Sequence, residues 1–464
     1  MNRGALLLLI IALIIGAFLR FHDLDALQMS ADEGATWAAA DAPSISELVA
    51  IQRTHNAGKL PVHDLMLHGW IAMFGDGLFA MRSFSALLGL VTILLMFPMT
   101  RELFRTGISS LPRDDIDFIA GLSALICAVS IVTIKYDREA RMYGLLLALA
   151  VAHVWIFLRT IRHQSITDYI ALAILTTAVL AVNLITAGLI ATEGLWLVVI
   201  LATSYSTDYR SALKVILTTG LAMAGGAAVL VPALYVPFLI GRHMLASGQM
   251  DWLTRPQWWE PFAFFNKASG SVAFPVLAVL AAWGAWNGWA RARMAIEFTV
   301  LWMWAPPIIL VAGSFIWRPV FLERYAIYSF PAFFILIALG IAQLRSEVVR
   351  GLAIVAVVTL ALGHVYSYSI KTHDADWREA GRVALASVGA QEQFAVMPAY
   401  AVEVVRYYMP PATRQEAIPY DATTNHSRVA VLAEHGVRDT NTSGVRRDFP
   451  HVIARTRGIV VLAR

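Results

Sequence analysis

The chain of 464 residues has a formal net charge of +4; 58% of its residues are hydrophobic and only 15% are charged. A soluble globular domain has about 25% charged residues, so this composition and a mean hydropathy of +0.64 exclude an ordinary soluble protein. The apolar residues form solid runs and not short alternating segments, which excludes a transmembrane β-barrel. The sequence therefore predicts an all-α multi-pass membrane protein.

Apolar runs follow one another along most of the chain, many of them close to the ~20 residues that a helix needs to cross a bilayer. We predict about 11 transmembrane helices from these runs. The predicted spans are 5–19, 79–99, 117–134, 142–159, 168–184, 187–204, 213–238, 271–289, 297–316, 324–343 and 351–369.

The first run follows MNRG and resembles a secretory signal. No small-x-small cleavage site comes directly after it, so we interpret it as a retained signal anchor. Cys127, the one cysteine, lies inside an apolar run and is expected to serve packing.

Basic residues gather in alternate loops, which indicates membrane topology and not nucleic-acid binding. With a cytoplasmic amino terminus, all of these sets fall on the cytoplasmic side. They are Arg3; Arg101, Arg105 and Arg113; Arg159, Arg162 and His163; Arg210 and Lys214; Arg291 and Arg293; and Arg345 and Arg350. We therefore predict a cytoplasmic (inner) membrane protein whose loop 20–78 and turn 136–143 face outside.

The tail differs from the rest of the chain. Charged residues and prolines occur throughout 371–464, with short apolar runs such as QFAVMPAY and GIVVLAR. We predict a small α/β extracytoplasmic C-terminal domain at 371–464, after a transmembrane core at 1–370.

The turn YDREARMY, residues 136–143, concentrates charge between two apolar runs. A charged turn can simply end a helix at the membrane surface. However, Asp137 and Arg141 are spaced to pair on a helix, and the turn also holds Arg138 and Glu139. Charges of both signs beside a membrane indicate a functional site.

A second cluster, SADEGATW, contains the adjacent acids Asp32 and Glu33. Two interpretations stay open. Ser30 or Asp32 could cap a short helix that runs to Ala40, or the two acids belong to a site on the outer side.

The segment HNAGKLPVHDLMLHGW, residues 55–70, contains three histidines, but the spacing of His55, His63 and His68 matches no tight metal-ligand pattern. Lys59 is a cation on an outer loop that could meet a phosphate or extend to the membrane surface. The following residues suggest an amphipathic helix that lies on the membrane.

The turn RPVFLERY places basic residues on the outer side, against the positive-inside rule. An arginine there needs a partner, either Glu323, another acid or a bound anion. Because a guanidinium suits phosphate recognition, Arg324 is a candidate for binding an anion.

The order of these features resembles a known family. The Asp-Glu pair is followed by FGDGLFAMRSFSALLGL at 74–90, YDREARMYGLLL at 136–147, ERY at 323–325, and DWREAGRVA with a later YY in the tail. This order is similar to the C-type fold of membrane glycosyltransferases. It looks most like protein mannosyltransferases and lipid A aminoarabinose transferases, in the bacterial branch that uses polyprenyl-phosphate sugars. The resemblance covers about 20–420.

The resemblance implies an inverting glycosyltransferase that moves a sugar from a polyprenyl-phosphate-linked donor to a hydroxyl of a lipid, glycan or protein at the outer face. It implies Asp32 as general base, with Glu33 assisting, and it matches Asp137 and Glu139 to a second acidic motif. The residues that it implies for the donor phosphate are Lys59, Arg138, Arg141, Arg324 and Tyr325.

No carboxylate set in the sequence is an obvious metal site, so we expect no required cofactor and no need for an added divalent cation. A transporter or flippase of lipid-linked glycans is the alternative function. Transporter sites lie near the bilayer midplane, often between repeated halves, whereas these charges gather at the outer ends of the spans. A membrane scaffold would leave the charged clusters without a purpose.

Overall fold

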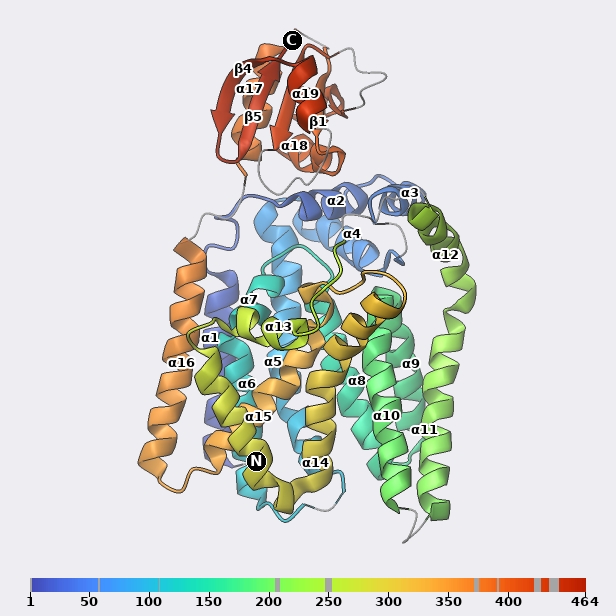
Figure 1. Cartoon of the computed structure of the whole chain (residues 1–464), viewed down its shortest axis with the longest axis vertical. Helices are drawn as coiled ribbons and strands as arrows, with labels where there is room; N and C mark the ends of the chain where they lie inside the picture. Colours follow the sequence, from blue (N-terminus) through green and yellow to red (C-terminus); the bar gives the residue numbers. More distant parts are fainter. Residues whose placement is uncertain are drawn as a thin grey trace. The chain divides into compact units, whose positions relative to one another are not determined.

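The computed structural model describes residues 2–56, 59–107, 109–204, 209–246, 253–370, 375–389, 392–420, 427–433 and 442–464 (Figure 1). The chain forms two compact units. The first is Met1–His22, Ser85–Arg138 and Met142–Ile370, and the second is Asp23–Phe84, Glu139–Arg141 and Lys371–Arg464. One boundary between the units lies at 370–371, and the division into a core at 1–370 and a separate tail domain stays a prediction. The tail, however, shares its unit with the loop after the first helix.

The first unit consists of helices, and Figure 1 shows the long ones running side by side. They are α1 (Arg3–Phe21), α5 (Leu78–Arg105, of which the part from Ser85 lies in this unit), α6 (Arg113–Val129), α7 (Ile131–Asp137), α8 (Tyr143–His163), α9 (Ile166–Val182), α10 (Ala187–Ser204), α11 (Tyr209–Val229), α12 (Val231–Ala246), α13 (Glu260–Ser269), α14 (Phe274–Ile316), α15 (Phe330–Ala342) and α16 (Glu347–Ile370). Short 3-10 turns η1 (Leu184–Thr186), η2 (Glu323–Tyr325) and η3 (Ile327–Ser329) connect some of them.

Seven helices of the described residues are long and apolar enough to cross a membrane, and the pair α6–α7, bent by 59°, makes up to eight. The eleven predicted spans all fall mainly on helices, and the numbers differ for two reasons. Ile166–Val182 and Ile327–Ala342 are apolar but shorter, and α14 alone covers two of the predicted spans. The predicted span 213–238 is interrupted, because α11 ends at Val229 and α12 begins at Val231.

The helix α14 has 43 residues and contains a break at Ala292, where φ is −149° and ψ is 48°. A Cβ atom on Gly288 would come within 2.8 Å of Cδ1 of Ile296. Eight residues of a straight helix would separate these positions by about 12 Å. The chain therefore folds back at the break, and α14 is two apolar segments.

Large apolar side chains of the first unit remain on its surface. Leu352 and Val355 of α16 are 64% and 62% exposed, and Ile14 of α1 is 65% exposed. Such continuous apolar faces are unfavourable in water but favourable in lipid. Helices can lie in lipid because they satisfy their own backbone hydrogen bonds. This confirms the prediction of a multi-pass membrane protein.

The second unit joins helices of the first loop to the tail. The loop supplies α2 (Ala31–Ala40), α3 (Ile45–His55), α4 (Val62–Phe74) and the first turns of α5. The tail supplies α17 (Trp377–Ser387), β1 (Phe394–Met397), η4 (Ala399–Ala401), α18 (Val402–Tyr408), η5 (Pro411–Glu416), β2 (Ala417–Pro419), β3 (Val429–Ala433), α19 (Thr442–Asp448), β4 (His451–Thr456) and β5 (Ile459–Ala463).

The five strands form one mixed sheet in the order β2-β1-β3-β5-β4. β1 is parallel to β2 and β3, and β5 is antiparallel to β3 and β4. The strands β1 and β3 are buried along their whole length, as expected when helices cover both faces of a sheet. The predicted α/β character of the tail is confirmed.

Candidate functional site

Helix α2 carries the acidic pair of the first loop, and its start is built by the sequence itself. Ser30 accepts a hydrogen bond from the Glu33 backbone N–H, and Glu33 Oε2 accepts one from the Ser30 backbone N–H at 3.0 Å. This reciprocal arrangement is a capping box, which satisfies two otherwise unpaired donors of the first turn. Of the two residues that the sequence offered as caps, Ser30 is the one that caps this helix, which ends at Ala40 as expected.

The Glu33 carboxylate is buried, and both of its oxygens are occupied. Arg82 donates from Nε to Oε1 at 2.8 Å and from Nη2 to Oε2 at 2.9 Å, and the Ala140 backbone N–H donates to Oε1 at 2.9 Å. Burial alone would raise the pKa of Glu33, but Arg82 and the backbone donors of Ser30 and Ala140 hold it below its usual value. Glu33 is thus a charged anchor inside the second unit.

Arg82 itself was not selected by the sequence reasoning, although it lies in the FGDGLFAMRSF segment. In addition to its bonds with Glu33, Arg82 donates hydrogen bonds to the backbone carbonyls of Leu24, Leu27 and Gln28 at 2.9 to 3.0 Å. One buried guanidinium therefore fixes the chain that leads into α2. A charged residue at the start of an apolar span was the available signal.

Asp32 differs from its neighbour because its side chain is 51% exposed. The nearly buried Arg141 places Nη2 at 3.8 Å from Asp32 Oδ2. Its Nη1 donates to the Asp32 backbone carbonyl at 2.7 Å and to Thr36 Oγ1 at 2.9 Å. The structure thus places a reachable carboxylate beside a fixed cation.

Electrostatic effects connect Arg141 and Lys59 with two residues of the segment 55–70. Arg141 and Lys59 both act electrostatically on His63 and on Asp64 at the start of α4. Burial and these two cations lower the pKa of His63 to about 3, so its imidazole is neutral at pH 7. Burial raises the pKa of Asp64, although the same cations oppose this. Asp64 was missed by the sequence reasoning, which read its segment as a membrane-surface helix.

The turn YDREARMY is divided between the two units. Asp137 lies in the first unit and pairs with Arg20 of α1, whose Nε is 2.8 Å from Oδ2. Both side chains are fully buried. The expected pairing of Asp137 with Arg141 is therefore corrected, because each has another partner. Arg138 donates to the carbonyls of Leu19 and His22 at the end of α1.

Other predicted residues have simpler surroundings. Glu139, in the second unit, is half-buried. The guanidinium carbon of Arg324 lies 5.9 Å from the ring centre of Tyr325, in the first unit. Glu323 pairs with Lys267 of α13 at 3.1 Å and raises the pKa of that lysine. The roles predicted for Glu139, Arg324 and Tyr325 stay predictions.

Comparison with solved structures gives the architecture. ArnT from Cupriavidus metallidurans bound to undecaprenyl phosphate matches with a TM-score of 0.64 and 14% identity, over 100% of this chain and 98% of that one. ArnT in the apo state matches with a TM-score of 0.62 and 15% identity, over 99% and 97%. An oligosaccharyltransferase from Archaeoglobus fulgidus in complex with Zn and sulfate matches with a TM-score of 0.57 and 10% identity. This match covers 92% of this chain and 68% of that one.

The chain has the C-type membrane glycosyltransferase (GT-C) fold. At this level of identity the likeness concerns the fold alone. No protein-family model and no curated protein matches the sequence.

The described part of this GT-C chain contains no group of three or more histidines, cysteines, aspartates or glutamates suited to a metal ion. The histidines of the 55–70 segment have other surroundings. His55 Nε2 lies 3.3 Å from Glu403 Oε1, and His68 Nδ1 lies 2.8 Å from the Ala40 carbonyl oxygen. Whether activity needs a metal stays a prediction.

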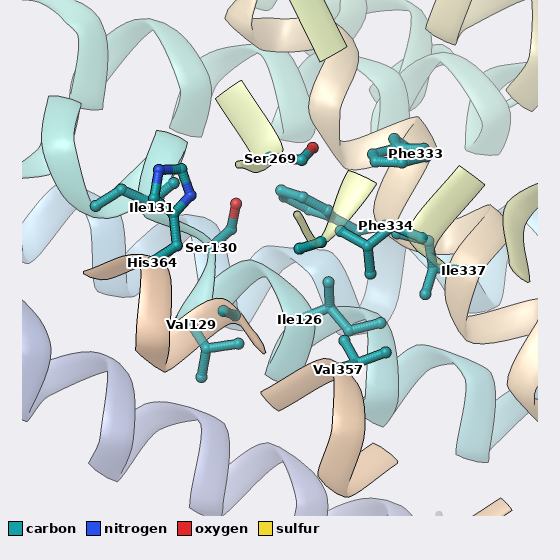
Figure 2. A pocket seen from close by; sticks show the side chains of 13 residues that line it. Ile126, Val129, Ser130, Ile131, Ser269, Phe333, Phe334, Ile337, Val357 and His364 are labelled. Carbon is teal, nitrogen blue, oxygen red and sulfur yellow. The ribbon is translucent and has the colours of Figure 1, made fainter. Parts of the chain in front are cut away.

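A small cavity lies in the first unit of the GT-C fold (Figure 2). Its volume is about 30 Å³, enough for one or two water molecules. Ser130, Ser269 and His364 are its polar lining, and Phe333 and Phe334 are among the apolar side chains around it. It is too small for a sugar phosphate and includes none of the predicted site residues.

Proposed function

We propose that this chain is an inverting glycosyltransferase that moves a sugar from a polyprenyl-phosphate-linked donor to a hydroxyl acceptor, with Asp32 as general base. The observation that carries the proposal is the exposed Asp32 carboxylate 3.8 Å from the buried Arg141 guanidinium. A base must be reachable by its substrate and ionised before the reaction.

The reaction is a single displacement. The acceptor oxygen attacks the anomeric carbon from the side opposite the phosphate, and Asp32 takes the hydroxyl proton. The bond between the anomeric carbon and the phosphate oxygen breaks, and its electron pair leaves with the lipid phosphate. Attack from the opposite side inverts the configuration.

The leaving phosphate gains negative charge as the bond breaks. Lys59 and Arg141 are cations of the second unit that act electrostatically on the same residues, His63 and Asp64. Preorganised cations stabilise such charge strongly in a poorly hydrated site. Glu33 and Arg82 supply the rigid frame that keeps α2, and therefore Asp32, in place.

The fold supports the class of substrate in this proposal. One structural neighbour, ArnT, is bound to undecaprenyl phosphate, and another is an oligosaccharyltransferase. A lipid-linked donor and a glycan, lipid or protein acceptor follow by analogy. Asp137 and Glu139 as an acidic motif, and Arg138, Arg324 and Tyr325 as phosphate ligands, remain part of the proposal.

We also propose that the amino terminus is cytoplasmic and that the tail and first loop face outside the inner membrane. The alternating basic loops support this orientation. A cysteine introduced at Ser387, in the tail, should react with a membrane-impermeant maleimide in intact spheroplasts. A cysteine at Ser346, in a predicted cytoplasmic loop, is the matched control and should react only after lysis. The native Cys127 is buried and should contribute little background.

The central experiment measures transfer by purified protein in detergent from a radiolabelled polyprenyl-phosphate sugar pool to cell-envelope acceptors. Asp32→Asn should lower the rate at least about 100-fold, because a general base contributes about 10²- to 10⁴-fold. Asp41→Asn, which changes an acid at the other end of α2, should keep most of the activity. Equal rates for wild type and Asp32→Asn would remove Asp32 as base.

One observation favours the second candidate function, a transporter or flippase of lipid-linked glycans. His153 of α8 lies 3.0 Å from Glu193 of α10 and 2.9 Å from Thr176 of α9, and all three are fully buried among spanning helices. Ionisable residues at such positions are functional candidates. Flipping of a fluorescent lipid-linked glycan can be measured in vesicles that contain the purified protein. If wild type flips the glycan and a folded Glu193→Gln variant does not, transport becomes the better-supported function.

A further inference from the structure

We propose that His63 and Asp64 form the subsite that holds the sugar of the donor, next to the cations that hold its phosphate. This inference rests on the proposed function and deepens it. It assigns specificity for the sugar to two residues at the start of α4.

The first observation is an unsatisfied buried atom. His63 is only 5% exposed, and its Nε2 has no hydrogen-bond partner among the described residues. Buried polar atoms are nearly always hydrogen-bonded, so an exception calls for a missing partner. The ring is held in place by contact with Phe84, whose centre is 5.9 Å away.

The second observation is the carboxylate that follows His63. Asp64 is 8% exposed, and Arg141 and Lys59 act electrostatically on it as they do on His63. Carboxylates and imidazoles are suited to sugar hydroxyls, because a carboxylate only accepts hydrogen bonds and a neutral imidazole can donate one and accept one.

Proximity connects these two residues to the donor. In the donor the sugar is bonded directly to the phosphate, so groups beside the phosphate ligands lie beside the sugar ring. Lys59 and Arg141 would hold the phosphate, and His63 and Asp64 would then meet ring hydroxyls. The ligand class is therefore a glycosyl phosphate with free ring hydroxyls.

The test separates binding of the sugar from binding of the phosphate. Affinities of the full-length protein in detergent are measured for undecaprenyl phosphate and for its glucosyl, mannosyl and 4-aminoarabinosyl esters. In wild type, at least one ester should bind more tightly than undecaprenyl phosphate. The dissociation constant of undecaprenyl phosphate divided by that of the ester reports the contribution of the sugar to binding.

His63→Phe keeps the shape of the ring and its contact with Phe84, but it removes the nitrogen atoms. This variant should lower the ratio about 3- to 10-fold, as expected for one neutral hydrogen bond. His63→Gln places an amide near the position of Nε2 and should restore part of the ratio that His63→Phe loses. Asp64→Asn should also lower the ratio. His68→Phe, five residues later in the same helix, is the control and should leave the ratio unchanged.

The outcomes distinguish the two proposals. If wild type binds neither undecaprenyl phosphate nor any ester, the proposed function itself fails. If wild type binds both, but His63→Phe and Asp64→Asn keep the full ratio, the sugar subsite is overturned and a water molecule is the partner of His63. Esters that bind no more tightly than undecaprenyl phosphate in wild type also overturn it.

Discussion

Gly34 of α2 and Val404 of α18 lie backbone against backbone, so closely that a Cβ atom on Gly34 would come within 2.6 Å of the Val404 nitrogen. Gly34 directly follows Asp32 and Glu33. The helix that carries the acidic pair is therefore packed against a helix of the tail. Trp37, one turn later, adds an edge contact with the Tyr407 ring at 5.2 Å.

This contact predicts that Gly34→Ala impairs both stability and transfer. The new methyl group must push α18 away from α2, and overpacking of this kind costs about 1–3 kcal/mol. Gly69 of α4 is the matched control, because a Cβ atom there would meet nothing within 4 Å. Gly69→Ala should be neutral or slightly stabilising. Thermal unfolding in detergent measures both, and equal midpoints for the two variants would contradict the packing argument.

The second prediction concerns the buried pair of Glu33 and Arg82. Arg82→Met leaves the Glu33 carboxylate buried without its partner, which should destabilise the fold by about 3–5 kcal/mol. Adding Glu33→Gln to this variant should recover part of the loss. The exposed pair Arg382–Glu379 of α17 is the control, and Arg382→Met should change the unfolding midpoint little. If Arg82→Met were as stable as Arg382→Met, the anchor role would be wrong.

The third prediction is a pH dependence that comes from His63. The unfolded chain binds a proton at this residue near its ordinary pKa of 6.5, and the folded chain does so at about 3. Between these values the unfolded state holds more protons, so stability falls as the pH drops, by up to about 1.4 kcal/mol per pH unit. The lowered pKa of Glu33 changes the stability with pH only below the ordinary pKa of that group, 4.5.

Unfolding midpoints from pH 4.5 to 6.5 test this prediction. Asp64 works in the opposite direction in this range, because its raised pKa favours the folded state at low pH. The comparison of wild type with His63→Phe therefore matters more than the wild-type slope alone. The variant should lose less stability on acidification, and parallel curves would rule out a buried neutral histidine.

Local patterns in the sequence were sufficient for several features of this fold. The apolar runs locate the spanning helices, and the loss of that pattern at 371 marks the α/β tail. Ser30 and Asp32 placed the start of α2 to within two residues, because serine and aspartate are preferred N-cap residues. Asp32 stood out as a candidate by its place just after the first span.

The partners of the charged residues could not be predicted in the same way. Arg20 meets Asp137 across 117 residues, and Arg82 meets Glu33 across 49. Spacing along one helix shows only neighbours three or four residues apart, so it suggested that Asp137 pairs with Arg141. The long-range contacts depend on how the helices pack, and the sequence alone does not contain that information in readable form.

The fourth prediction is that transfer needs no added divalent cation. The described residues offer no cluster for a metal, and the proposed mechanism assigns the phosphate charge to Lys59 and Arg141. Activity after treatment with EDTA and removal of the chelator should equal that of untreated protein. Loss of transfer that Mg²⁺ or Mn²⁺ restores would contradict this prediction and the charge assignment together.

The last prediction asks what Asp137 does in the first unit. Its carboxylate is buried against Arg20, and a Cβ atom on Gly89 would collide with it. Arg20 also donates to Thr133 Oγ1 and to the Ala128 carbonyl, so the pair ties α1 to the α6–α7 bend. Either single variant, Arg20→Met or Asp137→Leu, should destabilise the protein by leaving one buried charge unpaired. The double variant should regain most of the unfolding midpoint. If the pair is only structural, transfer returns along with folding. If transfer stays lost in the folded double variant, Asp137 belongs to the second acidic motif that the family resemblance implies. Because Asp137 belongs to the proposed acidic motif, we expect transfer to stay lost in the folded double variant.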